Sequence, residues 1–159
     1  MVDLTIKIKN FPKLHVAYIT HIGRYKDCYG AWERLLSWAK NSNINIDNII
    51  SVGVCYDNPE VVQDCRYDAC IQVEKGVITI DDIKTKVLES RKCISTIHKG
   101  SYDIMINTYK KIYTDKINER YGVDLLAPCF EIYKNNPHNT PPNELLTEIF
   151  VPLREQNNI

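Results

Sequence analysis

The chain has 159 residues, a length that suits one compact domain with a sizeable core. Its 20 lysines and arginines balance 20 aspartates and glutamates, and no strongly basic cluster interrupts the mixture, which argues against direct DNA binding. No apolar run approaches the ~18 residues of a membrane-spanning helix, and the N-terminus does not have the pattern of a signal peptide. We therefore expect a cytoplasmic protein with no membrane partner.

Residues 4–9 alternate apolar and polar side chains, and residues 14–20 are rich in β-branched residues. Both patterns are typical of strands. Phe11-Pro12 separates them, so a hairpin is predicted to open the domain.

A helix is predicted after Gly23, because apolar residues recur there at helical spacing. It should end near residues 41–43, a cluster of asparagine and serine. Strands at residues 50–56 and 67–73 follow. The apolar stripe of the helix consists of Cys28, Trp32, Leu35, Leu36 and Ala39.

The second half of the chain repeats the first at a shift of 77 residues, so a hairpin is predicted to open each half. His21–Tyr25 recurs as His98–Tyr102, and Ile6–Lys9 recurs as Ile83–Lys86. The last strand needs a shift of 80, which indicates a small insertion. The repeated helix stripe is Tyr109, Ile112, Tyr113 and Ile117, and the repeated closing strands are residues 128–133 and 146–153.

These elements predict a single α+β domain over residues 1–159, with one β-β-α-β-β repeat at about 1–76 and another at about 77–155. The two repeats should pair about a pseudo-twofold axis and join their strands in one antiparallel sheet. Both helices would cover one face, because each needs a sheet under its apolar stripe. The cleft where the helices meet is then a natural ligand site.

The candidate for the chemistry of that cleft is Glu131. Strand alternation alone leaves open whether this side chain is solvated or faces inward. The shift of 77 places Glu131 at the position of Val54, which shares a face with Val52 and Tyr56. We take that apolar face to be the one under the helix, so Glu131 is predicted to face the helices.

A carboxylate on an inward face needs compensation, because an unpaired buried charge costs several kcal/mol or shifts its pKa. A cationic ligand would supply it, and each aromatic ring near the cation would add about 0.5–2 kcal/mol. Each candidate aromatic residue could instead be ordinary core. The candidates are Trp32, Trp38, Tyr56, Tyr109, Tyr113 and Tyr133.

Other polar residues have simpler interpretations. Arg66 and Asp68 should lie on the strand face opposite Tyr67, which favours a structural ion pair or a turn contact. His21 and His98 precede glycines at strand ends, where histidines cap or pack, and no nucleophile at matching spacing completes a triad.

The six cysteines form no Cys-x-x-Cys pair, so we expect no metal and no cofactor. We interpret them as small apolar core residues in a reducing compartment. They are Cys28, Cys55, Cys65, Cys70, Cys93 and Cys129.

Several motifs, in order along nearly the whole chain, resemble the gyrase-inhibitory-protein-like (GyrI-like) family. This family also supplies the effector-binding domain of some multidrug-responsive transcription activators of the AraC and MerR types. The motifs are Val16–Tyr25, Trp38-Ala39, Gly53–Pro59, Arg66–Cys70, His98–Tyr102, Pro128–Tyr133 and Pro141–Leu145.

The resemblance implies two SHS2-like repeats, the binding of bulky and often cationic aromatic compounds, and Glu131 as the charge at the base of the pocket. In the activators the domain follows a helix-turn-helix segment. None precedes Leu4 in the sequence, so we expect a stand-alone member that does not itself read a promoter.

Three functions stay open on this basis. The one we favour is a module that binds lipophilic, cationic or aromatic compounds, with no catalytic residue. The second is a protein-interaction role like that of the founding member, with gyrase or a regulator as the partner. The third is a hydrolase of strained cyclopropane-bearing toxins, in which Glu131, Tyr133 and Tyr113 would act.

Overall fold

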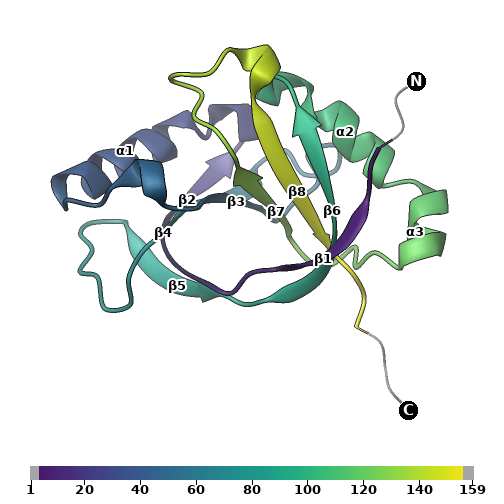
Figure 1. Cartoon of the computed structure of the whole chain (residues 1–159), viewed down its shortest axis with the longest axis horizontal. Helices are drawn as coiled ribbons and strands as arrows, with labels where there is room; N and C mark the ends of the chain where they lie inside the picture. The colour runs from purple at the N-terminus through teal and green to yellow at the C-terminus, as the bar shows by residue number, and fades with distance from the viewer. Residues whose placement is uncertain (1–3, 156–159) are drawn as a thin grey trace.

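Residues 4–155 of the computed structural model form one curled sheet with helices on one of its faces (Figure 1). The strands are β1 (Lys7–Phe11), β2 (Leu14–Gly23), β3 (Ser51–Cys55), β4 (Cys65–Gln72), β5 (Lys84–Leu88), β6 (Arg91–Lys99), β7 (Cys129–Tyr133) and β8 (Leu146–Pro152). The helices are α1 (Tyr29–Asn41), α2 (Met105–Ile112) and α3 (Asp115–Tyr121), with short 3₁₀ turns η1 (Tyr25–Asp27), η2 (Ile46–Asn48), η3 (Tyr102–Ile104) and η4 (Pro142–Glu144).

The sheet has the strand order β1-β6-β8-β7-β3-β4-β2-β5, and its neighbouring strands are antiparallel. The two halves of the chain join at the centre, where β3 pairs with β7. This confirms the predicted α+β fold with a joined antiparallel sheet.

The prediction that a hairpin opens each half was wrong. β1 pairs with β6 of the second half, and β5 pairs with β2 of the first half, so the halves exchange their first strands. Proline disfavours a helical conformation in the residue before it and has no amide hydrogen for a ladder. The chain therefore runs on past Phe11 and Pro12 from one side of the sheet to the other.

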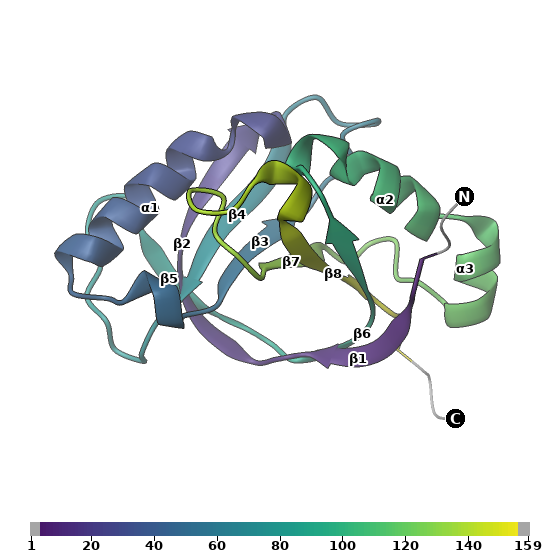
Figure 2. The same ribbon diagram turned by 45° about the horizontal axis from the view of Figure 1, so that its top comes forward.

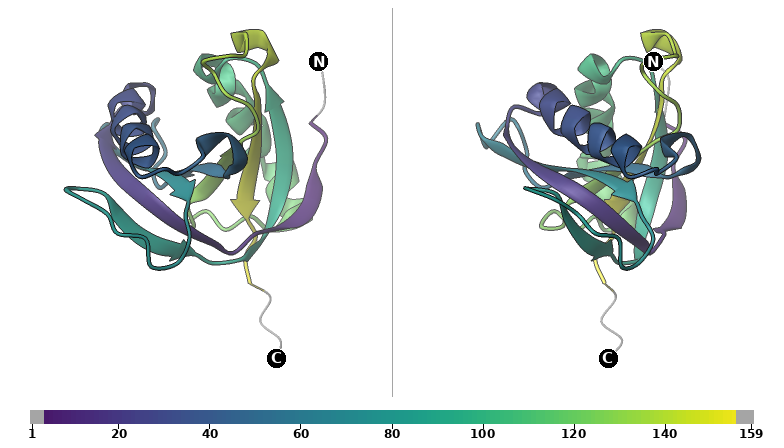
Figure 3. Two further views of the ribbon diagram at one scale, coloured as in Figure 1. Left: turned by 60° about the vertical axis from the view of Figure 1, so that its left-hand side comes forward. Right: turned by 90° about the vertical axis from the view of Figure 1, so that its left-hand side faces the viewer.

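The sheet is strongly curled (Figure 3). A hydrophobic core lies on its face away from the helices. Phe11 at the sheet edge stacks on Phe130 of the central strand β7, with ring centroids 4.4 Å apart. Phe150 of β8 meets the ring of Phe11 edge-on at 5.3 Å. Val52 and Val54 of β3 belong to the same core.

Helix α1 packs against β2 and β4. Its buried residues are Ala31, Leu35, Trp38 and Ala39, which repeat at helical spacing. The helix ends at Asn41 as predicted, and Asn43 just beyond it adopts a left-handed conformation with φ 59°. Asparagine tolerates this conformation better than most residues.

The second helical stripe is divided between two helices. α2 ends at Ile112, and the Thr114 side chain accepts a hydrogen bond from the Ile117 amide to start α3. The single predicted stripe was therefore wrong in its continuity, and Tyr113 lies at the break. Within residues 4–155, no helix combines the length and the apolar character needed to cross a membrane.

Candidate ligand-binding site

Glu131 lies near the centre of the sheet, directly opposite Gly53 of β3 and Ile149 of β8. Figure 2 shows this central region between α1 and α2. The carboxylate faces the helices, because Tyr109 of α2 donates a hydrogen bond to it. Only 7% of the residue is exposed.

The predicted orientation of Glu131 is correct, but the residue mapping behind it is wrong. Gly53 and Cys55 share its face, whereas Val52 and Val54 belong to the core on the opposite face. Side chains alternate along a strand, so an odd shift exchanges the two faces. The ladder therefore requires an even shift between β3 and β7, not 77.

Three donors compensate the buried carboxylate. Oε2 accepts hydrogen bonds from the Tyr109 hydroxyl at 2.5 Å and the Cys55 thiol at 3.5 Å. Oε1 accepts one from the Tyr133 hydroxyl at 2.7 Å. Among residues 4–155, no lysine, arginine or histidine forms an ion pair with Glu131.

A directed chain of hydrogen bonds continues from Tyr133. A phenol has one proton to donate, and Tyr133 gives its proton to Glu131. The Tyr67 hydroxyl, 2.7 Å away, must therefore donate to Tyr133. The indole Nε1 of Trp32 in turn donates to Tyr67 at 3.0 Å. The chain joins α1 through β4 and β7 to the carboxylate.

The tyrosines of this network remain protonated at neutral pH. Burial raises the pKa of Tyr109 and Tyr133 well above its ordinary value, and the charge of Glu131 raises it further. Burial likewise raises the pKa of Tyr67. All three hydroxyls are therefore available as donors.

Gly53 gives the tyrosine hydroxyls their room above the sheet. A Cβ atom at this position would lie 2.3 Å from the Tyr133 hydroxyl oxygen and 2.5 Å from that of Tyr67. Any larger residue would force both hydroxyls to move. The glycine is therefore part of the site, although it has no side chain to contribute.

Two aromatic paths lead from the surface to Glu131. Tyr102, 39% exposed, meets Tyr133 edge-on at 5.6 Å between ring centroids. Tyr113, 43% exposed, stacks on Tyr109 at 6.4 Å. Each exposed ring thus covers a ring whose hydroxyl bonds to the carboxylate.

Three of the six candidate aromatic residues meet in this cluster. Tyr109 and Tyr133 bond to Glu131, and Trp32 packs edge-on against Tyr133 at 5.6 Å. Tyr113 adjoins them through Tyr109, but its hydroxyl lies 2.6 Å from the Cys129 sulfur.

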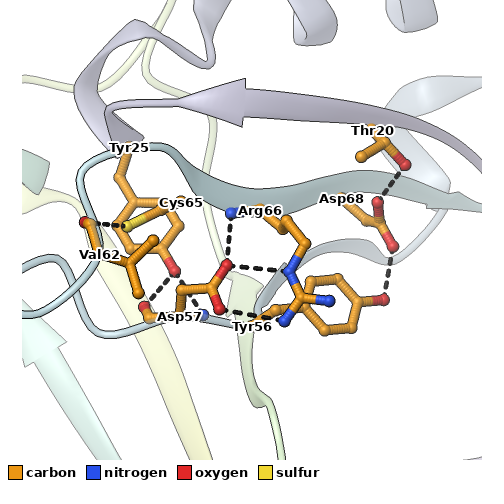
Figure 4. A network of polar contacts seen from close by, with 8 residues as sticks. All are labelled: Thr20, Tyr25, Tyr56, Asp57, Val62, Cys65, Arg66 and Asp68. Carbon is orange, nitrogen blue, oxygen red and sulfur yellow. Dashed lines mark hydrogen bonds and ion pairs between the residues drawn. The ribbon is translucent and has the colours of Figure 1, made fainter.

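The other two candidates lie elsewhere. Tyr56 lies on the opposite face of the sheet, where its hydroxyl donates to Asp68 at 2.6 Å (Figure 4). Tyr56 was predicted on the wrong face for the same reason as Val54: the two residues share a face, and the odd shift of 77 exchanged the faces. Trp38 is buried in the core beneath α1.

Tyr67, Cys55 and Gly53 were missed by sequence reasoning. Alternation does put Tyr67 with Ala69 on the buried face of its strand, but a buried tyrosine alone does not indicate a ligand site. An even shift between β3 and β7 would have put Gly53 and Cys55 on the face of Glu131, and Tyr67 is the partner of Cys55 in β4.

Tyr109 of α2 bonds to Glu131, and Tyr113, which follows that helix, stacks on Tyr109, so side chains fill the space above the carboxylate. An open groove of about 360 Å³ lies elsewhere, between α1 and residues 80–83, with Trp38 in its wall. Among residues 4–155, no group of three or more histidine, cysteine, aspartate or glutamate side chains could hold a metal ion.

Arg66 and Asp68 form structural contacts, as predicted, but with different partners. Arg66 pairs with Asp57 at 3.0 Å (Figure 4). Asp68 is buried and pairs with Lys86 of β5.

The two histidines occupy equivalent positions and make equivalent contacts. A ring nitrogen of His21 lies 3.0 Å from the Arg24 carbonyl oxygen, and one of His98 lies 3.0 Å from that of Ser101. Both close the turn that follows their strand, which agrees with the predicted capping role.

Comparisons with known proteins agree with this architecture. EcmrR is similar through its C-terminal domain, with a TM-score of 0.80 at 19% identity over 96% of this chain and 99% of that one. SAV2435 bound to tetraphenylphosphonium has a TM-score of 0.63 at 16% identity over 96% and 94% of the two chains. A hydrolase from Listeria innocua has a TM-score of 0.62 at 12% identity, over 94% and 92%.

At these identities, the solved structures establish a shared fold. The family model described as the GyrI-like small molecule binding domain matches residues 4–154, which is nearly the whole chain. The chain belongs to the GyrI-like family of small-molecule-binding domains.

Proposed function

We propose that this domain binds lipophilic cations with Glu131 as their counter-ion. The observation that carries the proposal is a carboxylate that is 7% exposed, has three hydrogen-bond donors and has no ion-pair partner within residues 4–155. The structure of SAV2435 bound to tetraphenylphosphonium supports this ligand class, since it shares the fold.

The energetics favour a cation over a neutral compound. Hydrogen bonds from neutral donors only partly replace the water that a buried carboxylate loses. A cation adds Coulomb attraction that a low-dielectric site screens weakly. The rings of Trp32, Tyr109 and Tyr133 would add cation–π attraction, about 0.5–2 kcal/mol each when well placed.

Entry of a ligand is expected to begin with Tyr102 and Tyr113. Both rings are partly exposed, and each covers a ring bonded to Glu131. Tyr113 also follows the last residue of α2, so its movement need not unwind that helix. A ligand that displaces the rings of Tyr102 and Tyr113 replaces their contacts with Tyr133 and Tyr109 by contacts of its own aromatic groups.

The test is a calorimetric titration with tetraphenylphosphonium and with neutral triphenylphosphine oxide. Glu131→Gln should weaken binding of the cation by at least about tenfold, or 1.4 kcal/mol, and leave that of the neutral compound nearly unchanged. Glu148→Gln is the matched control, because Glu148 is a buried acid on the other face of the sheet. Equal loss of both compounds in Glu131→Gln would contradict a counter-ion role.

Hydrolysis is a second candidate, supported by the arrangement of two phenol donors on one carboxylate. Glu131 could orient a water molecule as a base while Tyr133 or Tyr109 donates to the leaving group. Tyr109 would replace Tyr113 in this role, since the Tyr113 hydroxyl bonds to Cys129. Chromatographic detection of an opened cyclopropane substrate, lost in Glu131→Gln, would support this function, whereas intact substrate would exclude it for that compound.

A further inference from the structure

Two cysteines lie directly opposite each other in the central ladder. Cys55 of β3 and Cys129 of β7 are paired residues, and both face the helices beside Glu131. The amide of the next residue, Tyr56, donates to the Arg66 carbonyl of β4. The backbone N–H and C=O of Cys55 must then point toward β7. Cys55 and Cys129 are therefore opposed residues of the type whose backbone groups, not their thiols, are hydrogen-bonded to each other.

This type of pair separates the two thiols in a characteristic way. Opposed Cβ atoms in a hydrogen-bonded pair are about 5.5 Å apart, whereas a disulfide needs about 3.5–4.5 Å. Both cysteines are free. The geometry therefore suits one atom bridging the two sulfurs better than a direct sulfur–sulfur bond.

We propose that Cys55 and Cys129 form a dithiol site for trivalent arylarsenicals, compounds in which one arsenic carries an aromatic ring and can bond two thiols. The proposal rests on the same group of residues around Glu131 as the proposed function and deepens it by naming a second ligand class. Arsenic bonds through sulfur here, so a positive charge on the ligand is not required.

The condensation balances without an oxidant or a reductant. An arylarsenic(III) oxide reacts with two thiols, so that two S–H bonds break, two As–S bonds form, and the oxygen leaves as one water molecule. Burial raises the pKa of Cys129 to about 12, so its thiol is protonated as this reaction requires. Burial also raises the pKa of the Cys55 thiol, which donates a hydrogen bond to Glu131 at 3.5 Å, so both thiols supply the protons that leave in the water molecule.

The aromatic ring of such a compound has a defined place. The Tyr113 hydroxyl lies 2.6 Å from the Cys129 sulfur, and the Tyr113 ring stacks on Tyr109. When the partly exposed Tyr113 swings outward, the sulfur is uncovered and a face of the Tyr109 ring becomes free. The aryl group would pack where the Tyr113 ring had been.

The test uses phenylarsine oxide and mass spectrometry of the intact folded protein. We expect one phenylarsenic adduct, formed with loss of one water and reversed by 1,2-ethanedithiol. Cys55→Ala and Cys129→Ala should each abolish it. Cys70→Ala and Cys93→Ala should retain it, since these cysteines lie in the core on the other face. An adduct that survives in Cys55→Ala, or one lost in Cys28→Ala instead of Cys129→Ala, overturns the assignment.

A second measurement covers the case in which a variant does not fold. Phenylarsine oxide bound to the folded, unmodified chain should protect Cys55 and Cys129 from iodoacetamide added during unfolding in urea, as mapped by peptide mass spectrometry, whereas without it both cysteines should be alkylated. Protection of any other pair overturns the proposal.

The failure of this proposal can be told apart from failure of the cation site. Glu131→Gln should weaken tetraphenylphosphonium binding by at least about tenfold but still form the arsenic adduct. An adduct without any cation binding contradicts only the proposed function, and cation binding without an adduct contradicts only the dithiol site.

Discussion

Gly53 lies directly opposite Glu131 in the β3–β7 ladder, and its missing side chain makes room for the hydroxyls that reach the carboxylate. Gly53→Ala would place a Cβ 2.3 Å from the Tyr133 oxygen and 2.5 Å from the Tyr67 oxygen. Such overpacking costs about 1–3 kcal/mol. We expect urea denaturation to show this loss, together with weaker tetraphenylphosphonium binding.

Gly30→Ala is the control for that prediction. In α1, a Cβ at Gly30 would lie 4.0 Å from the nearest side-chain atom, on Arg34. Gly30 is the second residue of α1, where alanine fits the backbone without strain, so this change should stabilise the chain by about 0.4–1 kcal/mol by restricting the unfolded state. If Gly53→Ala behaves like Gly30→Ala, the tyrosine hydroxyls are not confined as we describe.

Glu148 should make the stability of the domain depend on acid pH. Burial by itself would raise its pKa, but hydrogen bonds from Lys9, Ser95 and Lys134 outweigh burial and lower it to about 2. The ionised form is therefore stabilised in the folded state. This contribution is fully present above the usual value of 4.5 and is lost as pH falls toward 2.

We therefore expect the stability difference between the unmodified chain and Glu148→Gln to be ~1–3 kcal/mol at pH 6 and to shrink between pH 4.5 and 2. Urea denaturation at several pH values measures it. Glu144→Gln, an exposed acid in η4, should show little difference at any pH. A difference for Glu148→Gln that stays constant down to pH 2 would refute the lowered pKa.

The buried acids Asp68 of β4 and Glu148 of β8 differ in the number of lysines with which they form ion pairs. Asp68 pairs with Lys86, whereas Glu148 pairs with both Lys9 and Lys134, at 2.7 and 2.9 Å. Lys86→Met should cost about 3–5 kcal/mol, because it leaves a buried carboxylate without its cation. Lys9→Met should cost about 1 kcal/mol, since Lys134 remains. Equal losses in urea denaturation would show that Lys134 contributes nothing to Glu148.

The same pseudo-symmetry explains what the sequence could and could not predict. The repeat predicted the order of the elements and the joined sheet. It could not predict that β1 pairs with β6, because β1 and β5 carry similar Ile-Lys patterns and nothing local distinguishes their partners. Edge pairing depends on how the whole sheet curls.

The prediction of the candidate site depended on whether the shift between the two halves is an odd or an even number of residues. A one-residue error in the repeat placed Tyr56 beside Glu131 and left out Cys55 and Tyr67. Sequence similarity between the halves is too low to exclude a slip of one residue, whereas the ladder hydrogen bonds exclude it. The predicted orientation of Glu131 was correct although the shift of 77 that gave it was not, because the face assigned to Val54 was wrong as well.

Tyr109 should stabilise the empty site while opposing the occupied one. Its hydroxyl donates to the Glu131 Oε2 atom at 2.5 Å, and the other donor to that atom is the weaker Cys55 thiol at 3.5 Å. Tyr109→Phe removes a hydrogen bond to a charged group, so the empty protein should lose about 1.5–3 kcal/mol. The ring remains, and with it the cation–π attraction. Without this hydroxyl, the buried carboxylate has one donor fewer to offset its lost hydration, and a bound cation can take the place of that donor. Tetraphenylphosphonium should therefore raise the melting temperature of Tyr109→Phe more than that of the unmodified chain.

Tyr113→Phe separates this effect from general loosening of the aromatic cluster. Its hydroxyl contacts the neutral Cys129 thiol, so its removal should cost less than about 1 kcal/mol and leave the ligand-induced shift nearly unchanged. A smaller shift in Tyr109→Phe than in the unmodified chain would mean that this hydroxyl contacts the ligand directly. The carboxylate would then act together with Tyr109 in the bound state, instead of exchanging that partner for the cation.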